Sequence, residues 1–126
     1  MVATLPIYDS IQDQKPSKVY TCYRTTVTIN EKLEELTEET NALHQQIKEL
    51  TAAITNETPP DEVKRIKEEV KPLEERASEL TYESILLFFP EFSVAEFQKL
   101  DPYDYQSFVI QISEMRQKIY SRTIKN

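Results

Sequence analysis

The sequence has no glycine, and it has one cysteine and one histidine in 126 residues. Without glycine the chain has no Gly-rich phosphate loop, nucleophile elbow or dinucleotide-binding fingerprint. Its turns must instead rely on Pro, Asn and Asp. A single cysteine, Cys22, cannot form an intramolecular disulfide, and its free thiol fits a reducing compartment. We therefore expect a cytoplasmic protein.

Long apolar runs and excess positive charge are also missing. No apolar stretch reaches the roughly 18 residues that a membrane-spanning helix needs. The first residues, "MVATLPIYDSIQDQKP", lack the basic region and apolar run of a signal peptide. The 22 acidic and 15 basic side chains give a net charge of −7, which disfavours binding to nucleic-acid phosphates. We expect a soluble, protein-binding chain that is neither secreted nor inserted into a membrane.

The residues that usually carry chemistry have no partners in this sequence. His44 lies in "NALHQQIKE", which is typical of a solvated helix. Cys22 would need a base, and His44 is the only histidine available to it. The carboxylates of "EELTEE" and "EEVKPLEE" recur every three or four residues, as on the wet face of an amphipathic helix. The sequence thus predicts no catalytic residue, no cofactor and no metal site, and we expect a protein that is not an enzyme.

The N-terminal part reads as an extended arm, residues 1–17, followed by one strand at about 18–29. The stretch "KVYTCYRTTVTI" is rich in β-branched and aromatic residues. Its alternation places Val19, Tyr23, Val27 and Ile29 on one half-buried face. A single strand is not stable alone, so it must pair with the arm, with the helical body or with another chain.

Two heptad seams predict long helices at about 30–55 and 60–88. The first seam consists of Ile29, Leu33, Leu36, Thr40, Leu43, Ile47, Leu50 and Ile54, and the second of Val63, Ile66, Val70, Leu73, Ala77 and Leu80. They are most simply buried as an antiparallel hairpin, although pairing with a second protomer fits equally. Thr58 is the expected cap of the second helix, with Pro59 or Pro60 in its first turn. Pro72 should kink or split that helix.

Two helix-start signals follow in the C-terminal third. "SVAE" is a capping box with Ser93 as the cap and Glu96 as its partner, and it predicts a helix at about 93–100. "LDPYDY" predicts a last helix at about 102–121, with Asp101 as cap and Pro102 as first residue. The predicted fold is mainly α: a short N-terminal β-strand, an antiparallel coiled-coil-like hairpin and a C-terminal helical subdomain. The predicted segments are 1–29, 30–80 and 81–126.

The stretch "LLFFPEF" concentrates apolar residues between these helices. Together with Tyr82 and Ile85, its leucines and first phenylalanines cover more than one helix face, so not all of them can point into one small core. Two interpretations are open. The residues complete the core together with the following helices, or part of them forms an exposed groove or self-association surface. The candidate partner-binding residues are Ile85, Leu86, Phe88, Phe89 and Phe92.

The order of elements in "FFPEFSVAEFQKLDPYDYQSFVIQI" resembles tail assembly chaperones of tailed bacteriophages and prophages of Gram-positive hosts. The resemblance covers roughly residues 82–119, about a third of the chain. It implies a small, mostly helical cytoplasmic protein that binds the helical tape measure protein, keeps it soluble and helps tail-tube subunits assemble around it. It implies no catalytic residue, and residues 18–80 have no counterpart in the family pattern.

The leading hypothesis is therefore a non-enzymatic phage tail assembly chaperone that shields apolar helical segments of a tape measure protein. We expect a protein partner and allow for a homo-oligomer, without nucleic acid or membrane. One alternative is an acidic inhibitor of the anti-defence type, which would present its Glu-rich hairpin to a nucleic-acid-binding enzyme. A second alternative is a structural coiled-coil component of a virion.

Overall fold

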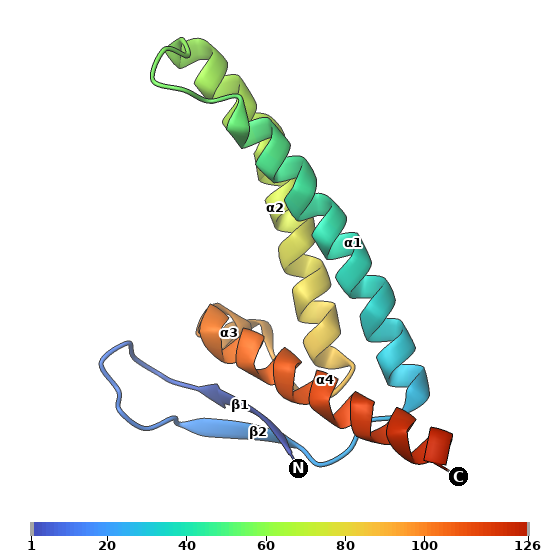
Figure 1. Cartoon of the computed structure of the whole chain (residues 1–126). Helices are drawn as coiled ribbons and strands as arrows, with labels where there is room; N and C mark the ends of the chain where they lie inside the picture. Colours follow the sequence, from blue (N-terminus) through green and yellow to red (C-terminus); the bar gives the residue numbers. More distant parts are fainter. Residues whose placement is uncertain (1, 126) are drawn as a thin grey trace. The chain divides into compact units, whose positions relative to one another are not determined.

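The computed structural model describes the backbone of residues 2–125 and the side chains up to residue 118. The elements follow the chain as β1 (Ala3–Ile7), β2 (Lys18–Cys22), α1 (Val27–Ala52), α2 (Pro60–Leu86), α3 (Val94–Gln98) and α4 (Pro102–Lys125) (Figure 1). The predicted fold class is confirmed, because the chain is mainly helical, α1 and α2 pack closely, and a short sheet lies at the N-terminus. Ile119 falls within the predicted last helix, and its side chain lies outside the described residues.

The chain forms two compact units. The terminal unit combines Met1–Glu31 with Ile85–Asn126, and the hairpin unit is Lys32–Ser84. The sheet and the C-terminal helices therefore share one unit, although the sequence-based segments listed them separately.

The sheet pairs β2 with the N-terminal arm, which is one of the three pairings left open by the sequence. The strands are antiparallel, with Ala3 opposite Cys22 and Leu5 opposite Tyr20. The predicted length is wrong, because β2 ends at Cys22 and α1 already begins at Val27. Thr26 explains this early start, since its hydroxyl accepts a hydrogen bond from the amide of Ile29 (3.2 Å) as a helix N-cap does.

The predicted buried face of β2 is also wrong. Val19 is 46% exposed and Tyr23 is 75% exposed, whereas Tyr20 and Cys22 are buried. The reason lies in β1, whose alternate residues Ala3, Leu5 and Ile7 are buried and stand opposite the even-numbered residues of β2. The apolar face of one strand is thus determined by its partner strand.

The free edge of β1 is covered by α4. The amide of Thr4 donates to the side-chain oxygen Oε1 of Gln111 (2.8 Å). Pro6 has no N–H, so its place on the same edge leaves no donor unpaired. The core of the terminal unit consists of buried residues from both strands, from α4 and from the segment that begins at the end of α2. They include Leu5, Tyr20, Ile85, Phe89, Phe92, Phe108 and Ile112.

Helices α1 and α2 form the hairpin unit, as the two seams predict. Leu36, Ile66 and Val70 are buried. The other seam positions within the hairpin unit are buried or partly buried, and no member of either seam is fully exposed. Pro72 lies inside α2 without splitting it, and its exposed position lets water satisfy the carbonyl group that loses its helical partner.

The turn of the hairpin is closed by threonines. The amide of Thr55 donates to Oγ1 of Thr58 (2.8 Å), and that hydroxyl in turn donates to the carbonyl of Ala53 (3.3 Å). Thr58 therefore closes the end of α1 and does not cap α2, which corrects the sequence-based expectation. Pro60 occupies the first position of α2, where a missing N–H costs nothing.

Candidate protein-binding surface

The terminal unit is built around five aromatic rings, which we call the aromatic cluster: Tyr20, Phe88, Phe89, Phe92 and Phe108. They come from β2, from the corner between α2 and α3, and from α4. Ring centroids are 5.1 Å apart for Tyr20 and Phe89 and 5.4 Å apart for Phe88 and Phe108. Tilted and edge-to-face pairs at such distances stabilise beyond simple burial. The cluster therefore ties the two ends of the chain into one core.

The structure divides the five predicted partner-binding residues into two groups. Ile85, Phe89 and Phe92 are buried, with Ile85 fully inaccessible, so they belong to the core. Leu86 and Phe88 remain partly exposed, and so does Leu87 between them. We call these last three residues the apolar rim. A backbone turn positions them, because the amides of Phe88 and Phe89 both bond to the carbonyl of Ile85 (3.0 Å each).

A polar brace joins β2 to α3 beside the aromatic cluster. The Tyr20 hydroxyl donates to Oε1 of Glu96 (2.6 Å), and Nζ of Lys18 donates to the same hydroxyl (2.9 Å). The Lys18 ammonium also lies 4.4 Å from the Tyr20 ring centroid, a cation–π distance. Ser93 completes the brace, since its amide also donates to Oε1 of Glu96 (3.1 Å).

These contacts shift the pKa values of Glu96, Tyr20 and Lys18. The Tyr20 hydrogen bond, more than any other contact, lowers the pKa of Glu96 below its ordinary value. Burial is the main cause of the raised pKa of Tyr20. The hydrogen bond between Lys18 and the Tyr20 hydroxyl is the main cause of the raised pKa of Lys18. Each group is thus held in its usual charge state at neutral pH. The brace is a stable structural link and has no group poised to exchange a proton near pH 7.

The sequence alone did not reveal Tyr20 as a partner of Glu96. Glu96 was identified through its capping box, but Tyr20 was assigned to the wrong face of the strand. The alternation of β1 is the signal that could have corrected this error. Ala3, Leu5 and Ile7 alternate with Thr4 and Pro6, and the buried face they form stands opposite Tyr20 in the register of the sheet.

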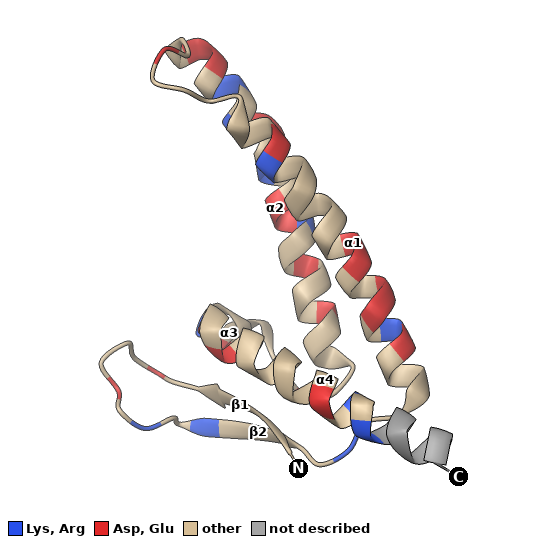
Figure 2. Ribbon diagram, in the orientation of Figure 1, with Lys and Arg blue, Asp and Glu red and all other residues tan. Residues whose placement is uncertain are grey.

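The hairpin unit carries the net charge of the protein. Its 53 positions include fourteen acidic and seven basic side chains, a formal charge of −7, whereas the terminal unit has eight of each. Figure 2 shows acidic positions along both α1 and α2. On one side of the hairpin, Arg76 bridges Glu39 of α1 (3.5 Å) and Glu79 of its own helix (3.1 Å). The hairpin unit is therefore acidic, whereas the terminal unit has no net formal charge.

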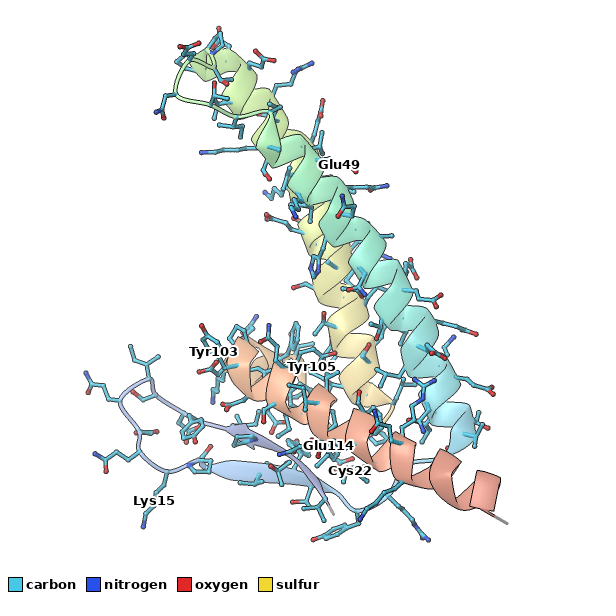
Figure 3. All side chains as sticks on the ribbon, in the orientation of Figure 1. Lys15, Cys22, Glu49, Tyr103, Tyr105 and Glu114 are labelled. Carbon is cyan, nitrogen blue, oxygen red and sulfur yellow. The ribbon has the colours of Figure 1, made fainter. Side chains whose placement is uncertain are left out.

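The one cysteine of the chain is not accessible. Cys22 is buried on the side of the sheet that faces α4 (Figure 3), and burial raises the pKa of its thiol. Its Sγ donates to the carbonyl of Arg24 (3.1 Å). Among the described side chains, no group of three His, Cys, Asp or Glu could hold a metal ion. No described helix is long and apolar enough to cross a membrane.

Comparisons with protein-family models, with curated proteins and with solved structures give no match to this chain.

Proposed function

We propose that this protein is a non-enzymatic tail assembly chaperone of a phage, and that it binds apolar helical segments of a tape measure protein in the host cytoplasm. The observation that carries this proposal is the apolar rim. Leu86, Leu87 and Phe88 are consecutive and partly exposed, although the neighbouring Ile85 and Phe89 are buried. Phe88 packs one side of its ring on Phe108, so Leu86, Leu87 and the exposed part of Phe88 remain for a partner.

The mechanism needs only reversible burial of apolar surface. An amphipathic helix presents a stripe of aliphatic side chains that fits against such a rim. Covering about 100 Å² of apolar surface contributes about 2.5 kcal/mol. This is less than the roughly 4 kcal/mol or more that association costs in lost freedom of motion, so a client helix must also contact residues next to the rim. The acidic hairpin supports the same role, because a net charge of −7 keeps a complex with an apolar client dispersed in water.

Charging the rim tests the proposal. Leu86→Glu introduces a carboxylate where an apolar partner would be desolvated, so we expect at least about tenfold weaker binding with unchanged helicity and melting. Binding is measured by fluorescence anisotropy with labelled helical peptides from the tape measure protein of the same phage. Leu86 is preferred to Phe88, since the Phe88 ring packs against Phe108 and its loss would disturb the aromatic cluster.

The matched control is Ile110→Glu. Ile110 belongs to α4 in the same unit and is 59% exposed, so this variant adds the same charge at an exposed apolar residue that is not part of the rim. It should bind peptides as the wild type does. Equal binding by Leu86→Glu and wild type would refute the rim as the binding surface. Unfolding of Leu86→Glu would instead assign the residue to the core.

A second candidate function rests on the charge distribution. The whole net charge lies in the hairpin unit, and this favours an acidic inhibitor that presents α1 and α2 to a basic, nucleic-acid-binding enzyme. Salt distinguishes the two functions. Binding through the acidic hairpin should weaken steeply between about 50 and 300 mM salt, whereas binding of an apolar helix to the rim should not.

A further inference from the structure

Helices α1 and α2 carry exposed stripes of opposite charge. On α2, Lys64, Lys67 and Lys71 follow one another at spacings of three and four and are all exposed. They line a shallow hollow together with Pro60, Val63 and Glu68. On α1, Glu31, Glu35 and Glu38 follow at spacings of four and three and are exposed as well, and Glu35 also pairs with the exposed Lys32 of its own helix (3.7 Å). Residues at these spacings share one side of a helix.

The two stripes match each other when the helices run antiparallel. Lys71, Lys67 and Lys64 then stand opposite Glu31, Glu35 and Glu38, in that order. The spacings match only in this direction. Read backwards from Lys71, the lysines are four and then three residues apart, and the glutamates read forwards from Glu31 have the same spacing. Antiparallel alignment also places the acidic first half of α1 beside the lysine-rich first half of α2, which is the electrostatically favoured choice.

Within one chain these stripes cannot meet. The Arg76–Glu39 bridge (3.5 Å) fixes how α1 lies against α2 in the hairpin. Counted from that bridge, Lys71 and Lys67 stand level with His44 and Lys48, so α1 offers positive or neutral groups there. Accordingly, none of the three lysines forms an ion pair with any described residue, although other lysines and arginines of the chain do.

We propose that a second copy of this chain docks on the lysine stripe through the glutamate stripe of its α1, with the two helices antiparallel. The copy also covers Val63 and Pro60, which line the same hollow. The contact uses different surfaces on the two copies, so a pair leaves one stripe of each kind free. Further copies therefore bind at the free stripes, and the assembly becomes either a closed ring or an open filament that is larger than a dimer.

Salt should affect this assembly in two opposite ways. Each hairpin has a net charge of −7, so whole copies repel one another. At about 10 mM salt the screening length is about 30 Å and this repulsion dominates, whereas at about 150 mM it is about 8 Å and the contacting pairs prevail. At about 1 M salt the contacting pairs are screened too. We therefore expect association to be strongest at intermediate salt, whereas purely apolar association would rise steadily with salt.

Charge exchange on the full chain tests the proposal by sedimentation velocity at about 150 mM salt. The triple variant Lys64→Glu, Lys67→Glu, Lys71→Glu should be monomeric, and so should the triple variant Glu31→Lys, Glu35→Lys, Glu38→Lys. The second variant has a formal charge near −1, so a loss of general repulsion would make it associate more than the wild type. An equimolar mixture of the two variants should associate again, because each supplies the stripe that the other has lost.

Two results would overturn the proposal. One is a wild-type chain that stays monomeric at every salt concentration, and the other is a mixture that fails to associate. Circular dichroism confirms that each variant keeps its helices. If a charge-reversed variant loses helicity, the corresponding Lys→Gln and Glu→Gln triples replace it, and association that persists in these neutral variants would equally contradict the assigned stripes.

Discussion

At the scale of single residues, Glu96 is the most connected side chain of the terminal unit. Its Oε1 atom accepts hydrogen bonds from the Tyr20 hydroxyl and from both the amide and the hydroxyl of Ser93. Its Oε2 atom lies 3.7 Å from Nζ of Lys18. One carboxylate thereby holds the start of α3 against β2, which are separated by more than seventy residues of sequence.

The pH dependence of stability should reveal this role. Because the pKa of Glu96 is lower in the folded protein than its ordinary value of 4.5, the ionised carboxylate stabilises the fold above that value. The stabilisation is lost as pH falls through the folded pKa. Glu96→Gln keeps an acceptor oxygen but has no charge, so its destabilisation should be largest near pH 7 and should shrink toward pH 3. Urea unfolding at several pH values measures this, and a penalty independent of pH would contradict it.

At the scale of elements, α3 is a helix of five residues that depends on its cap. Both halves of the capping box are formed: the Glu96 amide donates to Oγ of Ser93 (3.1 Å), and the Glu96 carboxylate accepts from the Ser93 amide (3.1 Å). A helix this short has few internal hydrogen bonds, so its end groups contribute much of its stability. The much longer α4 is also capped, since Oδ1 of Asp101 accepts from the Tyr103 amide (2.8 Å).

Removal of the cap should destabilise the terminal unit alone. Ser93→Ala should lower the free energy of unfolding by about 1 kcal/mol, the usual loss for an N-cap oxygen. Near-ultraviolet circular dichroism reports mainly on the terminal unit, which holds six of the seven tyrosines, and far-ultraviolet helicity is dominated by α1 and α2. We expect the first signal to melt earlier and the second to change little. Unchanged melting of both would mean that the cap contributes nothing in solution.

At the scale of the whole molecule, the chain leaves the terminal unit at Glu31 and returns to it at Ile85. The terminal unit has its own aromatic core and equal numbers of acidic and basic side chains, whereas the hairpin unit holds all the net charge. Folding of the terminal unit therefore brings together parts of the chain that are separated by the entire hairpin. Closing so long a loop is entropically costly, and the five-ring cluster offsets this cost.

The terminal unit should fold without the hairpin. Replacement of residues 32–84 by a flexible Gly/Ser linker of about 12 residues shortens the loop and leaves the aromatic cluster intact. We expect the tyrosine near-ultraviolet signal and cooperative melting to persist in this variant. Loss of both signals would show that the hairpin unit is needed to complete the core.

The sequence by itself determined the helices, because helix signals are local. The two seams, the capping box of Ser93 and the cap at Asp101 each use residues a few positions apart, and the structure confirms the four helices within a few residues of the predicted bounds. Errors occurred where local signals conflict. β-branched residues favoured a strand through Ile29, yet the cap at Thr26 starts a helix there.

Only the tertiary structure decided which apolar residues are core and which are surface. Ile85, Leu86, Phe88 and Phe89 are equally apolar in sequence, yet only Ile85 and Phe89 are buried. The Phe89 ring packs against Tyr20 and Phe108, which come from opposite ends of the chain. The face of β2 was decided in the same way, by Leu5 and its neighbours on β1. A local pattern records how often apolar residues recur, but burial depends on the partner that covers them, and that partner is distant in sequence.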